Sequence, residues 1–157
     1  MKITRAILAT AALWFTVTAL AFADNPQIGT WKLNESKSKF SPGGVKNHTV
    51  TYSEAEGGMI NVTVDGTDEN GKAFHWTMQC KFDGKPYKIE GNNINADTAI
   101  YKKVNDHTNN FTVMKDGKTV VTGTITVSKD GKSRTVTTTS TGADGKKVTD
   151  KACYDKE

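Results

Sequence analysis

Apolar and polar residues alternate with a period of two through most of the chain beyond residue 28. The clearest stretch is 74–82, where the odd-numbered residues are polar and the even-numbered ones share an apolar face. That apolar face consists of Phe74, Trp76, Met78, Cys80 and Phe82. The same alternation predicts about ten strands, near 28–33, 46–53, 59–65, 72–82, 85–90, 98–104, 108–115, 118–128, 133–141 and 146–156. No segment after residue 23 has the period of an amphipathic helix, and 34–46 is expected to be a loop with at most one helical turn.

A repeated turn signal separates many of these strands. The pattern Asn/Asp-Gly-Lys occurs five times, at Asn70-Gly71-Lys72, Asp83-Gly84-Lys85, Asp116-Gly117-Lys118, Asp130-Gly131-Lys132 and Asp144-Gly145-Lys146. The first two residues of each copy tolerate a positive φ, which a type I′ turn or a bulged hairpin loop requires. The pattern therefore predicts consecutive antiparallel hairpins.

The spacing of these hairpins favours one closed sheet. No crossover helix separates the strands, and a meander that closes on itself leaves no exposed edge. The predicted fold class is all-β, an antiparallel up-and-down β-barrel of about ten strands. A β-sandwich is the alternative, but it needs long Greek-key connections that the short turns of the second half do not provide.

The first 23 residues have the three parts of a secretory signal peptide. Lys2 and Arg5 precede an apolar stretch, and Ala21-Phe22-Ala23 forms a small-residue cleavage site. A membrane anchor is the alternative, although threonines interrupt the apolar run and no basic cluster follows it. We expect an exported protein, periplasmic or secreted, with one domain over residues 24–157 and no membrane span after cleavage.

The composition of the remaining 134 residues fits a β-protein and argues against nucleic-acid binding. They contain 19 Thr, 11 Val and a single Leu, Leu33, which excludes a helical bundle. After loss of Lys2 and Arg5 there are 19 basic and 17 acidic residues, and the lysines are scattered through turns rather than clustered. A nucleic-acid groove needs clustered basic residues with interleaved aromatics, so no nucleic-acid partner is expected. The protein is expected to be a monomer.

Both ends of the predicted barrel resemble those of a known family of β-barrels. Gly29-Thr30-Trp31-Lys32-Leu33 is similar to the first strand of lipocalins and other calycins, including intracellular fatty-acid-binding proteins. The segment Ala152-Cys153-Tyr154-Asp155-Lys156 resembles their last strand, which commonly closes with Arg-x-Tyr. The stretch 29–40 also resembles a group of small, uncharacterised exported bacterial proteins.

The resemblance implies a calycin-like barrel more than a fatty-acid carrier. Fatty-acid-binding proteins have a helix-turn-helix lid after the first strand, whereas 34–46 has no helix pattern. Their carboxylate-binding Arg falls on Ala152, so only Tyr154 of that motif carries over.

Signatures of catalysis and metal binding are not found. There is no nucleophile elbow, phosphate-binding glycine loop or zinc motif, and no cofactor is expected. His48, His75 and His107 are far apart in sequence, and His75 falls on the polar face of its strand. Asp65, Asp68 and Asn70 faintly resemble a calcium loop, but the turn chemistry of a hairpin explains them better. The protein is not expected to be an enzyme.

The inward-facing residues are the candidate site. Trp31, Tyr52, Phe74, Trp76, Met78, Phe111 and Tyr154 occupy faces that alternation assigns to the interior, and Arg134, the only Arg after residue 23, joins them if Val136 faces inward. An exposed Arg134 beside the 130–132 turn is the alternative. These residues could line a cavity for a small apolar or amphipathic ligand, without catalysis. They could instead fill the barrel, which would make the protein a structural or interaction module of the cell envelope.

The two cysteines are expected to remain free. Cys80 lies on the apolar face of its strand, whereas Cys153 alternates with Ala152 and Tyr154 and should point outward. The two strands are also distant in a meander. A disulfide needs Cα atoms within about 7 Å and side chains directed at each other.

Overall fold

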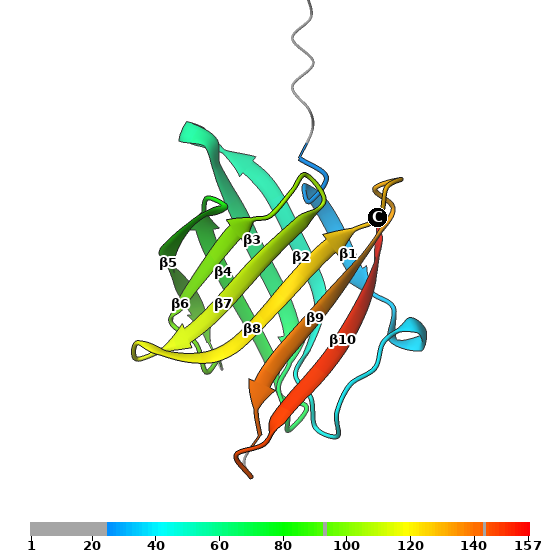
Figure 1. The fold of residues 1–157 in the computed structure, drawn as a ribbon, viewed down its shortest axis with the longest axis vertical. Coiled ribbons are helices and arrows are strands. Elements are labelled where there is room, and N and C mark those ends of the chain that lie inside the picture. Colours follow the sequence, from blue (N-terminus) through cyan, green and yellow to red (C-terminus); the bar gives the residue numbers. More distant parts are fainter. Residues whose placement is uncertain (1–24, 93, 143) are drawn as a thin grey trace, which may run out of the picture.

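Ten antiparallel strands form a closed barrel in a computed structural model of the chain, which describes residues 25–92, 94–142 and 144–157 (Figure 1). The strands are β1 (Gly29–Leu33), β2 (Lys46–Ala55), β3 (Met59–Thr67), β4 (Ala73–Cys80), β5 (Asp83–Asn92), β6 (Thr98–Lys103), β7 (Thr108–Lys115), β8 (Lys118–Val127), β9 (Ser133–Thr141) and β10 (Lys147–Lys156). Each boundary falls within two residues of the predicted one. The up-and-down barrel is confirmed and the sandwich alternative is wrong. The signal-peptide prediction lies outside the described residues.

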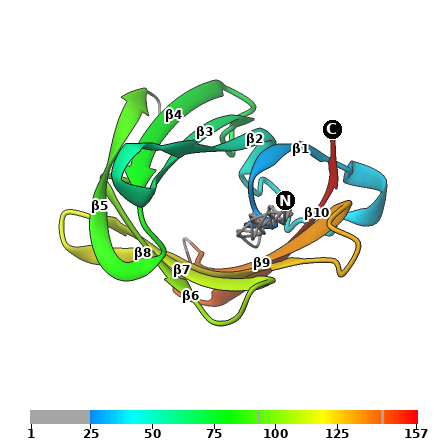
Figure 2. The ribbon, with the colours of Figure 1, turned by 90° about the horizontal axis from the view of Figure 1, so that it is seen from above.

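Each strand pairs with its neighbours in the chain, and β1 closes the ring between β10 and β2 (Figure 2). The turns therefore alternate between two ends of the barrel. The end at which β1 begins, here called the Trp31 end, also has the turns around residues 56–58, 104–107 and 128–132. The opposite end has the turns around 68–72, 116–117 and 142–146.

Strand β1 is half as long as β10, and the loop after it completes the closure. This loop contains a short 3-10 helix, η1 (Glu35–Lys37), and no lid of two helices. Beyond η1, Lys39 makes an isolated antiparallel bridge with Lys151 of β10. The loop thus pairs with the part of β10 that β1 is too short to reach.

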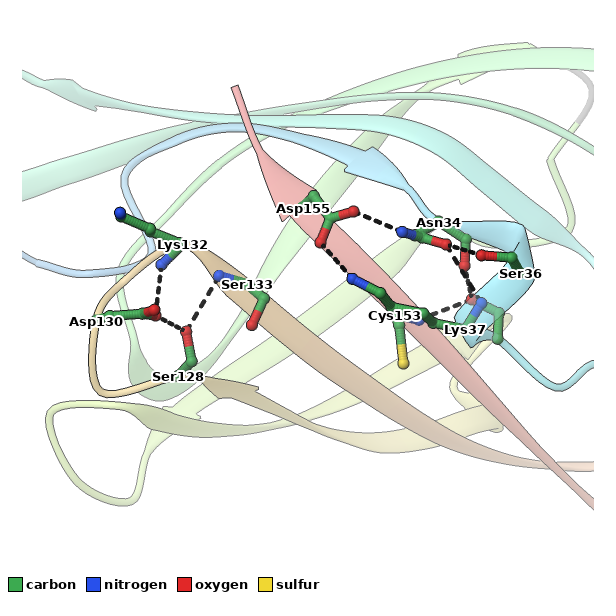
Figure 3. Close-up of polar contacts among 10 residues, drawn as sticks. Asn34, Ser36, Lys37, Ser128, Asp130, Lys132, Ser133, Cys153 and Asp155 are labelled. Carbon is green, nitrogen blue, oxygen red and sulfur yellow. Dashed lines mark hydrogen bonds and ion pairs between the residues drawn. The ribbon is translucent and has the colours of Figure 1, made fainter.

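A polar network holds η1 against β10 (Figure 3). The side-chain amide of Asn34 donates to Asp155 Oδ2 at 2.6 Å, and Lys37 Nζ donates to Asp155 Oδ1 at 3.4 Å. Ser38 Oγ donates to the Asn34 carbonyl and accepts from the backbone N–H of Cys153. The hydrogen bond from Asn34 keeps the pKa of Asp155 below its usual range, so this carboxylate is ionised at neutral pH.

Four of the five Asn/Asp-Gly-Lys segments form hairpin turns, as predicted. Among the described residues other than glycine, only Asp116 has a positive φ, 49°, and Gly117 follows at 73°, as in a type I′ turn. Asp83-Gly84 is the exception. It lies inside β5, where the pairing with β6 shifts register between Asp83 and Pro86. Gly84, at φ 79°, therefore forms a bulge rather than a hairpin turn.

Three strand glycines lie directly opposite aromatic residues on the neighbouring strand. The pairs are Gly66–Phe74, Gly91–Trp76 and Gly123–Phe111. A Cβ at Gly123 would lie 2.5 Å from Phe111 Cζ, and a Cβ at Gly66 would lie equally close to Phe74 Cζ. The missing side chains leave room for rings to lie across the strands, which is a recurrent device in curved sheets.

Both cysteines are free. Their side chains point as predicted from the alternation of inward and outward residues along each strand. Cys80 is fully buried on the inner face of β4, and burial raises the pKa of its thiol to about 12. Cys153 is half-buried on β10. The Cys80 thiol is therefore both inaccessible and protonated at neutral pH.

Thiol titration tests this arrangement. We expect two reactive thiols per chain in protein unfolded without reductant. In the folded protein Cys153 should react, whereas Cys80 should react only as fast as the barrel opens. A count of zero thiols in an unfolded, unreduced monomer would contradict the prediction that the two cysteines point to opposite faces. As a control, Cys153→Ser should leave only the slow reaction of Cys80.

Candidate functional site

The inner face of the barrel changes from buried to solvent-exposed along its axis. Residues paired directly across antiparallel strands share a face, so the register identifies the inward side chains. Toward the Trp31 end, the inward residues of β7–β10 are buried: Asn109, Ile125, Val127, Arg134, Ala152 and Tyr154. Toward the opposite end, the inward residues of the same strands are part-exposed: Phe111, Val113, Val121, Val136, Thr138, Ser140, Val148 and Asp150. Solvent therefore reaches the inward side chains of β7–β10 at the end opposite Trp31.

Half of the predicted site residues meet at the Trp31 end. Trp31 is fully buried there, and Tyr52, Arg134 and Tyr154 are each 3% exposed. The other predicted residues lie elsewhere on the inner face. Phe74 and Met78 are buried in β4, and Trp76 and Phe111 are half-buried. The strand register places all eight on the inner face, whereas a role in ligand binding remains a prediction.

Arg134 lies inside a cage of three aromatic rings. Its guanidinium carbon is 4.9 Å from the centre of the Trp31 ring, 5.1 Å from Tyr52 and 4.8 Å from Tyr154. The cage assembles because Arg134 pairs directly with Tyr154 across β9 and β10, while β1 and β2 supply the other two rings. The alternative, an exposed Arg134 beside the turn, is wrong. Arg134 is the first inward-facing residue of β9 and is 3% exposed.

The guanidinium has no anionic partner in the described part of the chain. No carboxylate lies within ion-pair distance of Arg134, and its buried Nε and Nη1 make no hydrogen bond. The neighbouring phenols do not supply the missing charge. Burial raises the pKa of the Tyr154 hydroxyl to about 12 and that of Tyr101 well above its ordinary value. Both phenols are therefore neutral at physiological pH.

Two further polar residues, Gln27 and Lys156, lie next to Trp31. The indole Nε1–H of Trp31 donates to the Gln27 carbonyl at 2.9 Å, but the buried side-chain amide of Gln27 has no partner. The ammonium of Lys156 lies 5.1 Å from the Trp31 ring centre and reaches the Pro26 carbonyl at 3.5 Å. Two cations thus approach one indole ring.

Sequence reasoning missed three residues of this region. Tyr101 is 5% exposed and stacks on Phe82 and Phe111, with ring centres 5.6 and 5.7 Å apart. Its alternation with Ala99 on β6 was the signal that could have identified it. Buried Asn109 and Gln27 had no such signal, because apolarity is the usual mark of an inward position.

The part-exposed inner face of β8–β10 combines valines with a few polar side chains. Thr138, Ser140 and Asp150 face inward among valines. The carboxylate of Asp150 accepts a hydrogen bond from the backbone N–H of Ser41 at 2.6 Å. This contact ties the loop after η1 to the rim of the barrel.

Two hollows lie away from the cage around Arg134. One, of about 530 Å³, lies between the loop after β1 and the β3–β4 turn, where Lys46 pairs with Glu35 and His48 contacts Thr67. The other, of about 360 Å³, lies over β7–β9 among outward-facing threonines. Neither contains an arrangement that indicates catalysis.

Histidine and aspartate positions agree with their predicted structural roles. His75 is exposed, and its Nδ1 lies 2.7 Å from Asp65 Oδ1. Asp68 Oδ1 accepts the backbone N–H groups of Asn70 and Lys72, as a hairpin turn requires. Within residues 25–92, 94–142 and 144–157, no three His, Cys, Asp or Glu side chains are grouped as metal ligands would be.

The comparisons identify no family. No family model matches the chain, and no curated protein sequence matches it either. Among the described residues, no helix is both long and apolar enough to cross a membrane.

Proposed function

We propose that this protein is an exported, non-enzymatic binding protein that holds a small apolar or amphipathic ligand inside its barrel. The observation that carries the proposal is the graded exposure of the inner face. The inward side chains of β7–β10 away from the Trp31 end remain part-exposed, so solvent reaches the inner face of these strands from that end. An apolar wall with a few polar groups is the usual lining of a ligand site.

The calycin resemblance supports the same proposal. Its two motifs begin and end the predicted barrel in the sequence, and in the structure β1 and β10 are paired neighbours. Trp31 of the first motif and Tyr154 of the second both contact the Arg134 guanidinium. The loop with η1 replaces the two-helix lid, so the proposal is a calycin-like binder rather than a fatty-acid carrier.

Binding of an environment-sensitive apolar dye tests the proposal. We expect the folded protein to enhance the dye's fluorescence and a competing fatty acid or sterol to reverse the effect. Trp76→Ala should change the affinity for the dye severalfold, because Trp76 is inward-facing and half-buried. The control, Thr124→Ala, removes an outward-facing side chain and should leave the affinity unchanged.

Failure of the protein to bind any of these compounds would favour the alternative function, a structural or interaction module of the cell envelope whose barrel is filled by its own side chains. The decisive observation would be no binding across fatty acids, sterols and aromatic probes, together with no ligand in native mass spectra of protein purified from its own host. The stacked rings of Phe82, Tyr101 and Phe111 would then be the core of a filled barrel.

A further inference from the structure

We propose that the first half of β10 is a docking edge for an extended peptide of alternating acidic and apolar residues, which adds to the sheet as an antiparallel strand beside β10. The proposal concerns the wall of the barrel and does not depend on a ligand inside it. Peptides recognised in this way bind through main-chain hydrogen bonds, and the side chains that flank the edge select among them.

The first half of β10 pairs with a strand on one side only. On the other side β1 reaches residues 154–156, and the loop after β1 adds one bridge, from Lys39 to Lys151. Among the described residues, 147–150 pair with β9 alone (Figure 1). These four residues are here called the β10 edge.

The loop turns away shortly after its bridge to β10. Gly43 has φ 72°, and the Gly44 N–H donates to the Ser41 carbonyl at 2.9 Å. With Pro42 before Gly43, this is the arrangement of a type II turn. The backbone N–H of Ser41 donates to the Asp150 carboxylate rather than to the backbone of β10. The loop therefore makes no further ladder along the β10 edge.

Four backbone groups of the β10 edge point away from β9 without a partner. In an antiparallel ladder, the N–H and C=O of every second residue point to the same side. Lys151 directs both groups away from β9, because they bond with the backbone of Lys39 at 2.7 and 2.8 Å. The same groups of Thr149 and Lys147 point the same way, and no hydrogen bond joins them to another described residue. Both residues are exposed, so a peptide can reach these groups.

The side chains along the β10 edge carry positive charge without counter-ions. Lys147 and Lys151 lie on the outer face, about 13 Å apart along the strand, and Lys39 lies opposite Lys151. All three are exposed, and none is within ion-pair distance of a described carboxylate. Two lysines directly opposite each other are mutually repulsive, so acidic side chains in an added strand would be stabilised here.

The same lysines disfavour a second copy of this chain as the occupant. Pairing of two β10 edges would bring lysine-bearing strands together, and lysine on an edge strand is a usual protection against self-association. An acidic peptide is attracted by the charge that repels a second barrel. Val148 faces inward and is part-exposed, so apolar residues at alternate positions of the peptide have a surface to cover.

Two patterns of N-methylation test the geometry of docking. The probe is a capped hexapeptide of alternating Glu and Val, titrated into the isotope-labelled protein and followed by the backbone amide resonances of residues 147–151. Residues directly opposite in an antiparallel pair share a face, so the Glu residues face outward with Thr149 and direct their N–H groups to β10. Methylation of the Glu nitrogens should weaken binding about ten-fold or more, whereas methylation of the Val nitrogens, which point to solvent, should change it less than about two-fold. Equal affinities, or no saturable shift at residues 147–151 with the unmethylated peptide, would overturn the proposal.

Thr149→Pro tests the edge from the side of the protein. The Thr149 N–H points away from β9, so proline removes one donor of the edge and spares the β9–β10 ladder. The peptide should bind about five-fold more weakly, since one main-chain hydrogen bond is lost. The matched control, Thr149→Ala, keeps the N–H and should bind as the wild type does. Unchanged binding by folded Thr149→Pro would overturn the proposal, and if that variant does not fold, the methylated peptides decide alone.

Exchange of charges tests the choice of an acidic partner. A hexapeptide with Lys in place of Glu should bind about ten-fold more weakly than the acidic one. Lys147→Gln should reduce this preference, whereas Lys129→Gln, in the exposed β8–β9 turn at the Trp31 end, should leave it unchanged. Equal affinity of the wild type for the two peptides would overturn an acidic partner. Sedimentation equilibrium should show a monomer, and a dimer that Thr149→Pro dissociates would overturn the proposal in favour of a second copy.

Discussion

Replacement of Trp31 by alanine is expected to lower the free energy of unfolding by about 3–5 kcal/mol, the usual cost of a large-to-small change in a core. Trp31 is fully buried, packs beneath Arg134 and donates its indole N–H to the Gln27 carbonyl. The substitution removes all three interactions and leaves a cavity at the end of the barrel. Denaturant unfolding followed by circular dichroism measures the loss.

Two matched variants separate burial from the hydrogen bond. Trp76→Ala makes the same substitution at a half-buried position and should cost less than Trp31→Ala. Trp31→Phe keeps a ring next to Arg134 but loses the bond to Gln27, and should cost about 1–2 kcal/mol. A loss below about 1 kcal/mol for Trp31→Ala would show that this end of the barrel is not part of the core, because buried large-to-small changes cost more than that.

Replacement of Gly66 by alanine is expected to destabilise the barrel by about 3 kcal/mol, at the upper end of the range for overpacking. A Cβ at this position would collide with the Lys46 carbonyl oxygen on β2 and would lie 2.5 Å from Phe74 Cζ. The first obstacle is backbone, which cannot move without loss of the β2–β3 pairing. Thermal or denaturant unfolding of the variant measures the effect.

Gly71→Ala is the matched control for Gly66→Ala. Gly71 lies in the adjacent turn with φ 76°, and a Cβ there would meet nothing within 4 Å. Only the strain of a left-handed residue remains, at about 1 kcal/mol. Equal losses in the two variants would show that close packing of the ring against Gly66 is unimportant.

The number and positions of the strands could be predicted because their signals are local. Alternation over 74–82 needs no knowledge of the rest of the chain, and a short Asp-Gly segment sets the geometry of its own turn. The same locality explains the error at Asp83-Gly84. A positive φ at Gly84 fits a bulge as well as a turn, and only the register with β6 distinguishes the two.

Part of the candidate site could be predicted for the same reason. The alternation of inward and outward residues assigned Trp31, Tyr52 and Tyr154 to the interior. The assignment of Arg134 depended on whether Val136, two residues further along β9, faces inward. This alternation does not show, however, how far along the barrel axis an inward residue lies. Whether Arg134 was an exposed residue near a turn or the base of the lumen could not be read from β9 alone.

The sequence by itself therefore determined an all-β chain of ten strands, the approximate strand limits and the face on which each side chain lies, since these follow from a period of two and from turn residues. Only the tertiary structure decided which inward residues meet. Closure of the ring through β1 brings Trp31, Tyr52 and Tyr154 around Arg134, and the stagger of the strands sets which inward residues solvent reaches. The physical reason is that contacts across a barrel depend on pairing between strands distant in sequence, which no local pattern specifies.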